Sequence, residues 1–457
     1  MKHRIIRTLL CCFLALLMCS SALESIAVSY EPSMTGALWT AHFSDPYFMG
    51  TSMTSTPVVT GSSVYVVNKD TLYELDRKKG TIQWQIDLAK RMNSVCDPIL
   101  DGDSLYIPLS DGVLQCVDIR SHSIRWTGEP HLPSGVNSCQ TLGRLSFLGG
   151  YLYAGTWCPT GHEATDHDVA SDGTFFCIDP ADGHTVWSYR DTLHPVGFYW
   201  TKSVSSHGRV FFTSEDGTLV SHDPATEKVY ETKSLTEGKQ LRCGLCADEN
   251  GDNLFTVSKD GILIRVQLSE NGTVSGVDRI PIFPNTSIVC TSTPARYGNT
   301  IYFGCSVNGY ASIAAFDTDS LHLRFLIGKT IRGDIKSCPL IVPTGIGRER
   351  NIFFTINENS GSAYMITDDD SSIVPRIQTL FTPYRDKQYC LANLVCGSDG
   401  TLYYSNDSGT LFALGDTFIS SDEPNRDKNK KKKLLKKLRR ILMKFFDNKN
   451  TKEVVIK

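Results

Sequence analysis

One sequence feature limits the fold more than any other: a pattern of four short strands that recurs along the body of the chain. The first unit contains the alternating segments Val64–Val67 and Thr71–Asp76, a turn at Gly80, and the segment Thr81–Trp84. The second unit repeats this order over residues 97–126. Units of this size cannot bury an apolar face alone, so the repetition predicts several similar sheets packed against one another.

The end of the third strand in each unit marks the period. These marks are Asp76, Asp118, Asp179, Asp223, Gln267, Asp317, Thr367 and Gly415. Successive marks lie 42, 61, 44, 44, 50, 50 and 48 residues apart, and the interval of 61 contains an insertion between Trp157 and Ser171. Four-stranded units at roughly this period are typical of β-propeller blades. The sequence predicts an all-β, eight-bladed propeller over residues 28–418; the alternative is seven blades, if the weakly marked units near Gln267 or Thr367 merge.

Three residue types recur at fixed distances within these units. An aspartate ends the third strand, where it can accept hydrogen bonds from backbone N–H groups. A glycine follows four residues later at Gly80 and Gly183, where a tight turn needs a positive φ. An aromatic ring comes eight residues after the aspartate, in a position to pack between neighbouring blades. These rings are Trp84, Trp126, Trp187 and Phe325.

This Asp–Gly–Trp spacing resembles the docking motif of the quinoprotein-like (pyrroloquinoline-quinone repeat) β-propellers. The resemblance covers about residues 37–415 as a repeat architecture. It implies the fold of that family. The tryptophan motif is structural in the family, so it does not imply a cofactor.

The two ends of the repeat are complementary. The last unit, residues 400–414, has no fourth strand after it, whereas the body begins with an isolated fourth-strand pattern at Gly36–Phe43. Pairing of these two segments would close the ring and remove an exposed sheet edge. We expect residues 36–43 to form the outer strand of the eighth blade.

The first 27 residues have the pattern of an export signal. Lys2, Arg4 and Arg7 precede a short apolar run at 9–19, and small residues at 25 and 27 fit the positions before a cleavage site at Val28. The apolar run is too short to span a bilayer. A lipoprotein would need a small residue where Met18 precedes the acceptor cysteine. We therefore expect an exported protein that is extracellular or associated with the cell envelope.

Export would leave 12 of the 15 cysteines in the mature chain. Most of these lie inside apolar strand patterns, as Cys116 and Cys177 do, where a thiol packs as a small hydrophobe. An even number of cysteines outside the cytosol permits disulfides, but we expect mostly buried thiols. The single CxxC, Cys243–Cys246, has no second pair at zinc spacing, which argues against a zinc or redox centre.

Charge is divided unevenly along the chain. From Arg426 onward there are 14 Lys and Arg against three Asp and Glu, a surplus of +11. The first 27 residues contribute +2 and the whole chain carries −3, so residues 28–425 carry −16. An acidic body of this kind excludes a nucleic-acid-binding domain.

The basic end of the chain predicts three segments: a linker at 419–429, a basic amphipathic helix at 430–446 and a disordered tail at 447–457. Apolar residues recur in the helix at intervals of four, three and four, which is typical of helices that lie in an anionic membrane interface. The alternatives are a solubilising tail and a helix docked on the acidic body. The predicted contact residues are Lys433, Leu434, Lys436, Lys437, Leu438, Arg439, Arg440, Ile441 and Phe445.

The insertion in the third unit carries the only candidate metal ligands, Cys158, His162, His167 and Asp168. Such side chains can share Zn²⁺, but no helical framework orients the two histidines. A solvated loop that recognises a partner is the favoured interpretation. We predict no resident metal.

The family resemblance also raises an enzyme hypothesis. Dehydrogenases of this family hold a quinone and Ca²⁺ at the propeller axis, beside a disulfide between adjacent cysteines. The only adjacent pair in this chain is Cys11–Cys12, inside the predicted signal, and no residues can be matched to the calcium ligands. No Gly-x-Ser-x-Gly elbow or phosphate loop is present. We therefore predict no cofactor and no catalytic residue.

These observations predict an exported, non-catalytic propeller that binds a protein or an envelope polymer and is tethered by its tail. A related propeller lipoprotein of Gram-negative bacteria scaffolds outer-membrane protein assembly, but its lipid-acceptor cysteine has no counterpart here. One alternative is a quinone- or metal-dependent oxidoreductase. Another is an extracellular carbohydrate or polymer binder that contacts its ligand through Phe198, Tyr199 and Trp200, although these rings are equally well explained as core residues.

Overall fold

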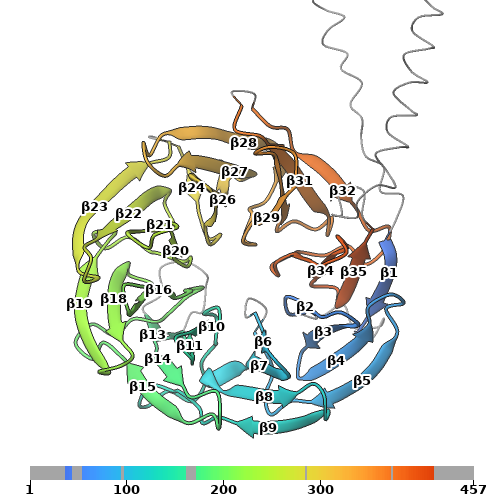
Figure 1. Cartoon of the computed structure of the whole chain (residues 1–457), viewed down its shortest axis with the longest axis horizontal. Helices are drawn as coiled ribbons and strands as arrows, with labels where there is room; N and C mark the ends of the chain where they lie inside the picture. Colours follow the sequence, from blue (N-terminus) through green and yellow to red (C-terminus); the bar gives the residue numbers. More distant parts are fainter. Residues whose placement is uncertain are drawn as a thin grey trace, which may run out of the picture.

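The described part of the computed structural model is a ring of eight antiparallel blades (Figure 1). It comprises residues 37–43, 54–93, 97–160, 171–283, 286–371 and 374–415. The eight-bladed, all-β prediction is therefore confirmed. The signal, linker and tail helix expected from the sequence lie outside the described residues. Within the part of the chain described here, no helix is long and apolar enough to cross a membrane.

Within each blade, the strands follow one another from the axis to the rim (Figure 1). The first blade contains β2 (Val58–Val59), β3 (Ser63–Asn68), β4 (Thr71–Asp76) and β5 (Ile82–Asp87). The second contains β6 (Ile99–Asp101), β7 (Ser104–Pro108), β8 (Leu114–Asp118) and β9 (Ser123–Thr127), with a 3₁₀ turn, η1, at Ser110–Gly112. The third contains β10 (Ser146–Leu148), β11 (Tyr151–Gly155), β14 (Phe175–Ile178) and β15 (Thr185–Tyr189), and the insertion between its second and third strands forms the hairpin of β12 (Cys158–Pro159) and β13 (Ser171–Asp172).

The remaining blades continue the same order. The fourth contains β16 (Val204–Ser206), β17 (Arg209–Thr213), β18 (Thr218–Asp223) and β19 (Lys228–Ser234), and the fifth contains β20 (Cys246–Ala247), β21 (Asn253–Val257), β22 (Ile262–Leu268) and β23 (Val274–Pro281). The sixth contains β24 (Ile288–Val289), β25 (Ala295–Tyr297), β26 (Thr300–Val307), β27 (Tyr310–Asp317) and β28 (Leu323–Arg332). The seventh contains β29 (Leu340–Pro343), β30 (Arg350–Thr355), β31 (Ala363–Asp368) and β32 (Gln378–Phe381), and the eighth contains β33 (Val395–Cys396), β34 (Leu402–Asn406), β35 (Thr410–Leu414) and β1 (Ala37–His42).

Ring closure occurs where the sequence predicts it. Strand β1 pairs antiparallel with β35, with Ala37 opposite Leu414 and His42 opposite Thr410. The Phe43 N–H extends the ladder by donating to the Gly409 carbonyl at 2.8 Å. The eighth blade is thus built from both ends of the repeat, which leaves β35 without an open edge.

Burial of the middle strands explains their apolar sequences. Every residue of β3 and β26 is buried, whereas β5 at the rim is largely exposed. The middle strands are covered on both faces by neighbouring blades, so both of their faces must be apolar. The core consists accordingly of clusters between blades; one joins Tyr302 of β26 to Ile352 and Phe354 of β30.

The predicted docking motif connects neighbouring blades. The Trp126 ring of β9 packs on Gly183 of the third blade, and its indole N–H donates to the Pro180 carbonyl at 2.9 Å. Gly183 has a φ of +81°, as the sequence predicts. Trp84 stacks instead on His122 of the second blade, with ring centroids 4.5 Å apart.

The aspartates of the motif stabilise their turns as expected. Asp76 accepts hydrogen bonds from the backbone N–H groups of Lys78 and Lys79, and Asp118 accepts them from Arg120 and Ser121. These contacts fix the turn on which the neighbouring ring packs.

The contact between the sixth and seventh blades departs from this motif. Asp368 at the end of β31 accepts hydrogen bonds from Arg324 and Arg350, each at 2.8 Å, and from the Tyr302 hydroxyl. Although burial opposes its ionisation, the bonds from Arg324 and Tyr302 and the nearby arginine charges lower the pKa of Asp368. The weakly marked unit near Thr367 is therefore a complete blade, joined to its neighbour by buried polar contacts.

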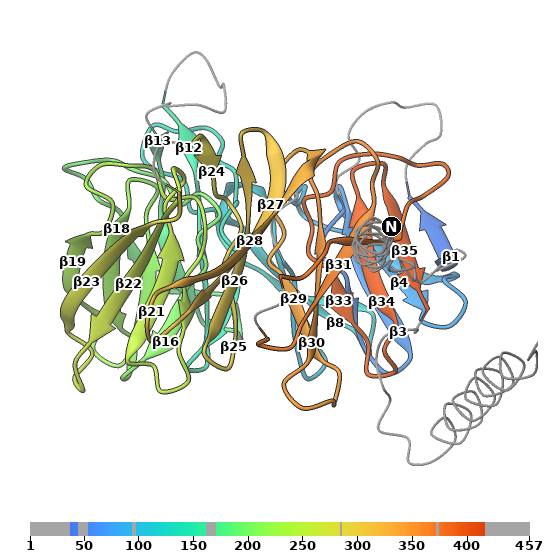
Figure 2. The ribbon, with the colours of Figure 1, turned by 90° about the horizontal axis from the view of Figure 1, so that it is seen from above.

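The two faces of the ring differ in the length of their connections. Because the four main strands of each blade alternate in direction, the links between blades and the turns between the second and third of these strands all lie on one face. This loop face includes the long connections 128–145, 190–203, 235–245 and 382–394. The hairpin of β12 and β13 rises from it (Figure 2). The opposite, turn face carries shorter connections and both ends of the described body, residues 37 and 415.

The fit between Trp126 and Gly183 generates a prediction. A Cβ at residue 183 would lie 2.4 Å from the Trp126 ring, in addition to the cost of a positive φ. We expect Gly183→Ala to lower the free energy of unfolding by about 2–4 kcal/mol, measured by urea denaturation.

Gly150→Ala is the matched control, because Gly150 has a φ of +88° but no atom within 4 Å of the added Cβ. That variant should lose only about 1 kcal/mol. Equal losses in the two variants would show that the contact with Trp126 contributes nothing.

Candidate binding face

A buried carboxylate organises the loop face around the third and fourth blades. Glu215 lies in the turn between β17 and β18, and 3% of its surface is exposed. One carboxylate oxygen accepts hydrogen bonds from the Trp157 indole at 2.6 Å and the Ser171 hydroxyl at 2.8 Å. The other accepts from Arg242 Nε at 2.7 Å. Glu215 therefore connects the insertion hairpin to the loop at 235–245.

Aromatic rings surround this ion pair. The Arg242 guanidinium lies 4.1 Å from the centroid of the Tyr199 ring, which also makes an edge contact with Trp157. Phe198 is fully buried and Trp200 is 9% exposed. These two rings therefore belong to the core. The hypothesis that Phe198, Tyr199 and Trp200 together form an exposed carbohydrate contact is wrong.

A disulfide and a second ion pair hold the insertion hairpin. Cys158 of β12 is bonded to Cys139, which lies in the connection 128–145. Asp172 of β13 forms a bidentate pair with Arg190, whose Nε lies 2.9 Å from the carboxylate. Burial opposes ionisation of Asp172, but the hydrogen bonds from Arg190 and from the Gly173 N–H lower its pKa. The base of the insertion is thus anchored on two sides.

The disulfide removes Cys158 from the candidate metal ligands of the insertion. The Cys158 sulfur is not a free thiolate, whereas His162, His167 and Asp168 lie outside the described residues. In the part of the chain that the structure describes, no group of three His, Cys, Asp or Glu side chains could hold a metal ion. The other described cysteines are free, and most are buried, as the sequence indicates. The pairing of Cys139 with Cys158 was not foreseen.

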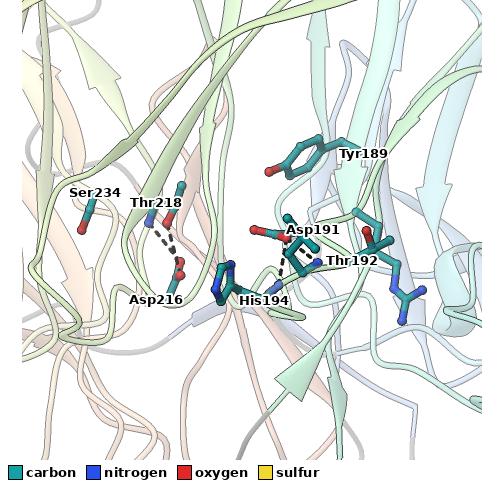
Figure 3. A pocket seen from close by; sticks show the side chains of 9 residues that line it. Tyr189, Asp191, Thr192, His194, Asp216, Thr218 and Ser234 are labelled. Carbon is teal, nitrogen blue, oxygen red and sulfur yellow. Dashed lines mark hydrogen bonds between the residues drawn. The ribbon is translucent and has the colours of Figure 1, made fainter.

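A cavity of about 430 Å³ opens beside this anchored hairpin, between the third and fourth blades (Figure 3). Tyr189 at the end of β15 and the following residues 190–194 form one wall. Asp216, Thr218 and Ser234 of the fourth blade form the other. Figure 3 shows His194 between Asp191 and Asp216.

The two carboxylates of this cavity are oriented by their own turns. Asp191 accepts hydrogen bonds from the N–H groups of Leu193 and His194, each at 2.9 Å. Asp216 accepts one from the Thr218 N–H at 3.0 Å. Burial, followed by the negative charges of Asp191 and Asp216, raises the pKa of Tyr189, so its hydroxyl remains protonated.

A second cavity, of about 270 Å³, lies on the other side of the end of β19. Its wall includes Leu235, Ile262 and Ile264, and Arg279 donates to the Leu235 carbonyl at 2.6 Å. The loop face thus has one polar and one more apolar depression on either side of the fourth blade.

Comparison with known proteins identifies the relatives of this chain. The family model described as "Outer membrane protein assembly factor BamB" matches residues 25–270, which is more than half of the chain. The chain belongs to this family. A search of curated proteins finds no match.

Solved structures show how widely the BamB fold is shared. BamB from Moraxella catarrhalis is 14% identical with a TM-score of 0.54, and the match covers 84% of this chain and 99% of that one. The quinohemoprotein alcohol dehydrogenase ADHIIG from Pseudomonas putida HK5 is 10% identical with a TM-score of 0.58, and the match covers 86% and 78%. At these identities the likeness concerns the fold alone. The predicted resemblance to the quinoprotein-like propellers is confirmed.

The Glu215–Arg242 pair generates a prediction about the loop face. Glu215→Gln keeps the size of the side chain but removes the buried negative charge that faces Arg242. Because removing one charge of a buried ion pair is costly, the free energy of unfolding should fall by about 3–5 kcal/mol in urea denaturation.

Asp103→Asn is the matched control. Asp103 pairs with Arg120 at 2.6 Å on the turn face, where 80% of the arginine side chain is exposed. This variant should unfold almost like the wild type, because exposed pairs contribute little. A similar small effect of Glu215→Gln would contradict the role assigned to Glu215.

Proposed function

We propose that this protein is an exported, non-catalytic β-propeller that binds partner proteins through its loop face. Its basic tail would hold it at an anionic surface of the cell envelope. The main observation in support is that exposed apolar side chains lie on the loops of this face, and that buried contacts hold loops of the same face in place.

These side chains come from three separate connections. Leu193 is 84% exposed and Tyr384 is 90% exposed; Phe283, Val289 and Tyr389 are also exposed on this face. Tyr and Phe side chains with exposed rings are enriched in protein interfaces. Exposed apolar side chains at several loop tips support a protein partner better than a small substrate.

Rigidity of the loop bases supports the same function. The Glu215–Arg242 pair holds the connection 235–245 and the Cys139–Cys158 disulfide holds the connection 128–145. The Glu215 N–H also donates to the Gly197 carbonyl at 2.9 Å, in the connection that carries Leu193. A surface that is already ordered loses less entropy on association than a flexible one. The loop face is therefore suited to recognise a partner without large rearrangement.

Family membership supports a protein partner in the envelope. The matching family is described as an outer membrane protein assembly factor, and the predicted signal at residues 1–27 agrees with export. We infer a partner that takes part in envelope assembly.

The oxidoreductase alternative rests on the shared fold of the dehydrogenases. It is tested by titrating the mature protein with pyrroloquinoline quinone and Ca²⁺ while tryptophan fluorescence is recorded. We expect no saturable quenching. Saturable quenching together with dye-linked alcohol oxidation would replace the scaffold proposal with the enzyme.

Site-specific photo-crosslinking tests the loop face in cells of the source organism. A benzophenone amino acid at Leu193 or Tyr384 should give discrete crosslinked products with a partner protein. The matched control is Ile346, which is 61% exposed on the turn face. Crosslinks from Ile346 but not from the two loop positions would contradict the proposal.

The tail is tested separately. Each basic residue near an anionic membrane contributes about 1 kcal/mol, so residues 430–457 should dominate surface binding. We expect deletion of these residues to abolish sedimentation with vesicles containing phosphatidylglycerol and to leave the melting temperature unchanged. Equal sedimentation of the full and shortened chains would eliminate the tether.

A further inference from the structure

We propose that the cavity between the third and fourth blades binds a lysine or arginine side chain of the partner protein. This inference rests on the proposed function, because it names the chemistry by which the loop face recognises its partner. It is carried by a polar cavity that contains two carboxylates without a paired cation.

The carboxylates of Asp191 and Asp216 lie on opposite walls of the cavity (Figure 3). Their hydrogen bonds come from backbone N–H groups and hydroxyls of their own turns. Neither forms a salt bridge with another residue of the described chain. The cavity therefore presents negative charge to a ligand.

The arginine that lines the cavity cannot neutralise them. Arg190 directs Nε and Nη2 at the two oxygens of Asp172, at 2.9 and 2.5 Å. Asp172 is buried on the insertion hairpin, so breaking this pair would leave a buried charge unpaired. The other basic side chain of the lining, His194, forms no salt bridge with either carboxylate among the described residues, so both can pair with a cation from a bound molecule.

The remaining lining suits a long basic side chain. Tyr189 adds an aromatic side chain to the lining, and the hydroxyls of Thr218 and Ser234 can accept hydrogen bonds from a cation. A volume of about 430 Å³ lies within the usual range for ligand sites. An anion would be repelled by the two carboxylates.

Leu193 adds an apolar contact to the proposed recognition of a lysine or arginine side chain. It also lines the cavity, yet 84% of its surface is exposed. A partner segment with an apolar residue beside its lysine or arginine would cover Leu193 while the cation enters. Such a segment combines charge complementarity, which selects the partner, with apolar burial.

Peptide titration of the mature full-length protein tests the inference. The probe is acetyl-Leu-Arg-Leu-amide, measured by isothermal titration calorimetry at low salt. Its matched control carries citrulline, a neutral side chain of nearly the same shape, in place of arginine. We expect saturable binding of the arginine peptide and at least tenfold weaker binding of the citrulline peptide.

Variants locate the binding to this cavity. The double variant Asp191→Asn, Asp216→Asn should weaken the arginine peptide at least tenfold, whereas Asp103→Asn on the turn face should not change it. Unchanged melting temperatures establish that the variants are folded. Equal affinity of the two peptides, or no effect of the double variant, overturns the inference. Binding of neutral disaccharides that depends on Asp191 and Asp216 also overturns it, in favour of a carbohydrate ligand.

The crosslinking experiment separates this inference from the proposed function. Suppose that Tyr384 gives discrete crosslinks but the Asp191 and Asp216 substitutions do not weaken the arginine peptide. The proposal of a protein-binding loop face then stands, and only the proposed lysine or arginine site is rejected. Absence of crosslinks from every loop-face position rejects the scaffold itself, whatever the peptide binds.

Discussion

The structure depends on the packing of each blade against the next. A single blade has apolar side chains on both faces of its middle strands, so it is stable only between two neighbours. The rings of Trp39 and Trp126 fix this stacking because each packs on a glycine of the following blade, Gly80 or Gly183. Between the sixth and seventh blades, the buried ion pairs around Asp368 add to the contact. Tryptophan–glycine packing at some contacts and buried ion pairs at another thus both hold neighbouring blades together.

The sequence predicts contacts that recur at a fixed spacing and misses those that occur once. The period of the aspartates and tryptophans indicated eight blades, and the isolated strand before residue 43 indicated how the ring closes. Glu215 and Arg242 lie in different connections, and no repeat relates them. The same holds for Cys139 with Cys158, and for Asp191 with Asp216. Such pairs are set by the path of individual loops, which local patterns do not specify.

The loop face shows how one fold serves proteins of different function. The blades provide a rigid ring in an assembly factor and in a dehydrogenase alike, and the connections determine what is bound. In this chain the connections of the third and fourth blades are fixed by Glu215 and by the anchored insertion, and they frame an acidic cavity. The properties that distinguish this protein therefore lie in residues outside the repeat.

The eighth blade can close only after almost the whole body of the chain has been synthesised. Strand β1 emerges early in synthesis, but its partner β35 comes 370 residues later, since Ala41 pairs with Leu411. Until the last blade is complete, the growing chain has an unpaired edge at each end, and such edges invite association with other chains. A nascent chain that stops before residue 410 cannot close its ring, because β35 is then missing. The ring therefore closes only when all eight blades have been synthesised.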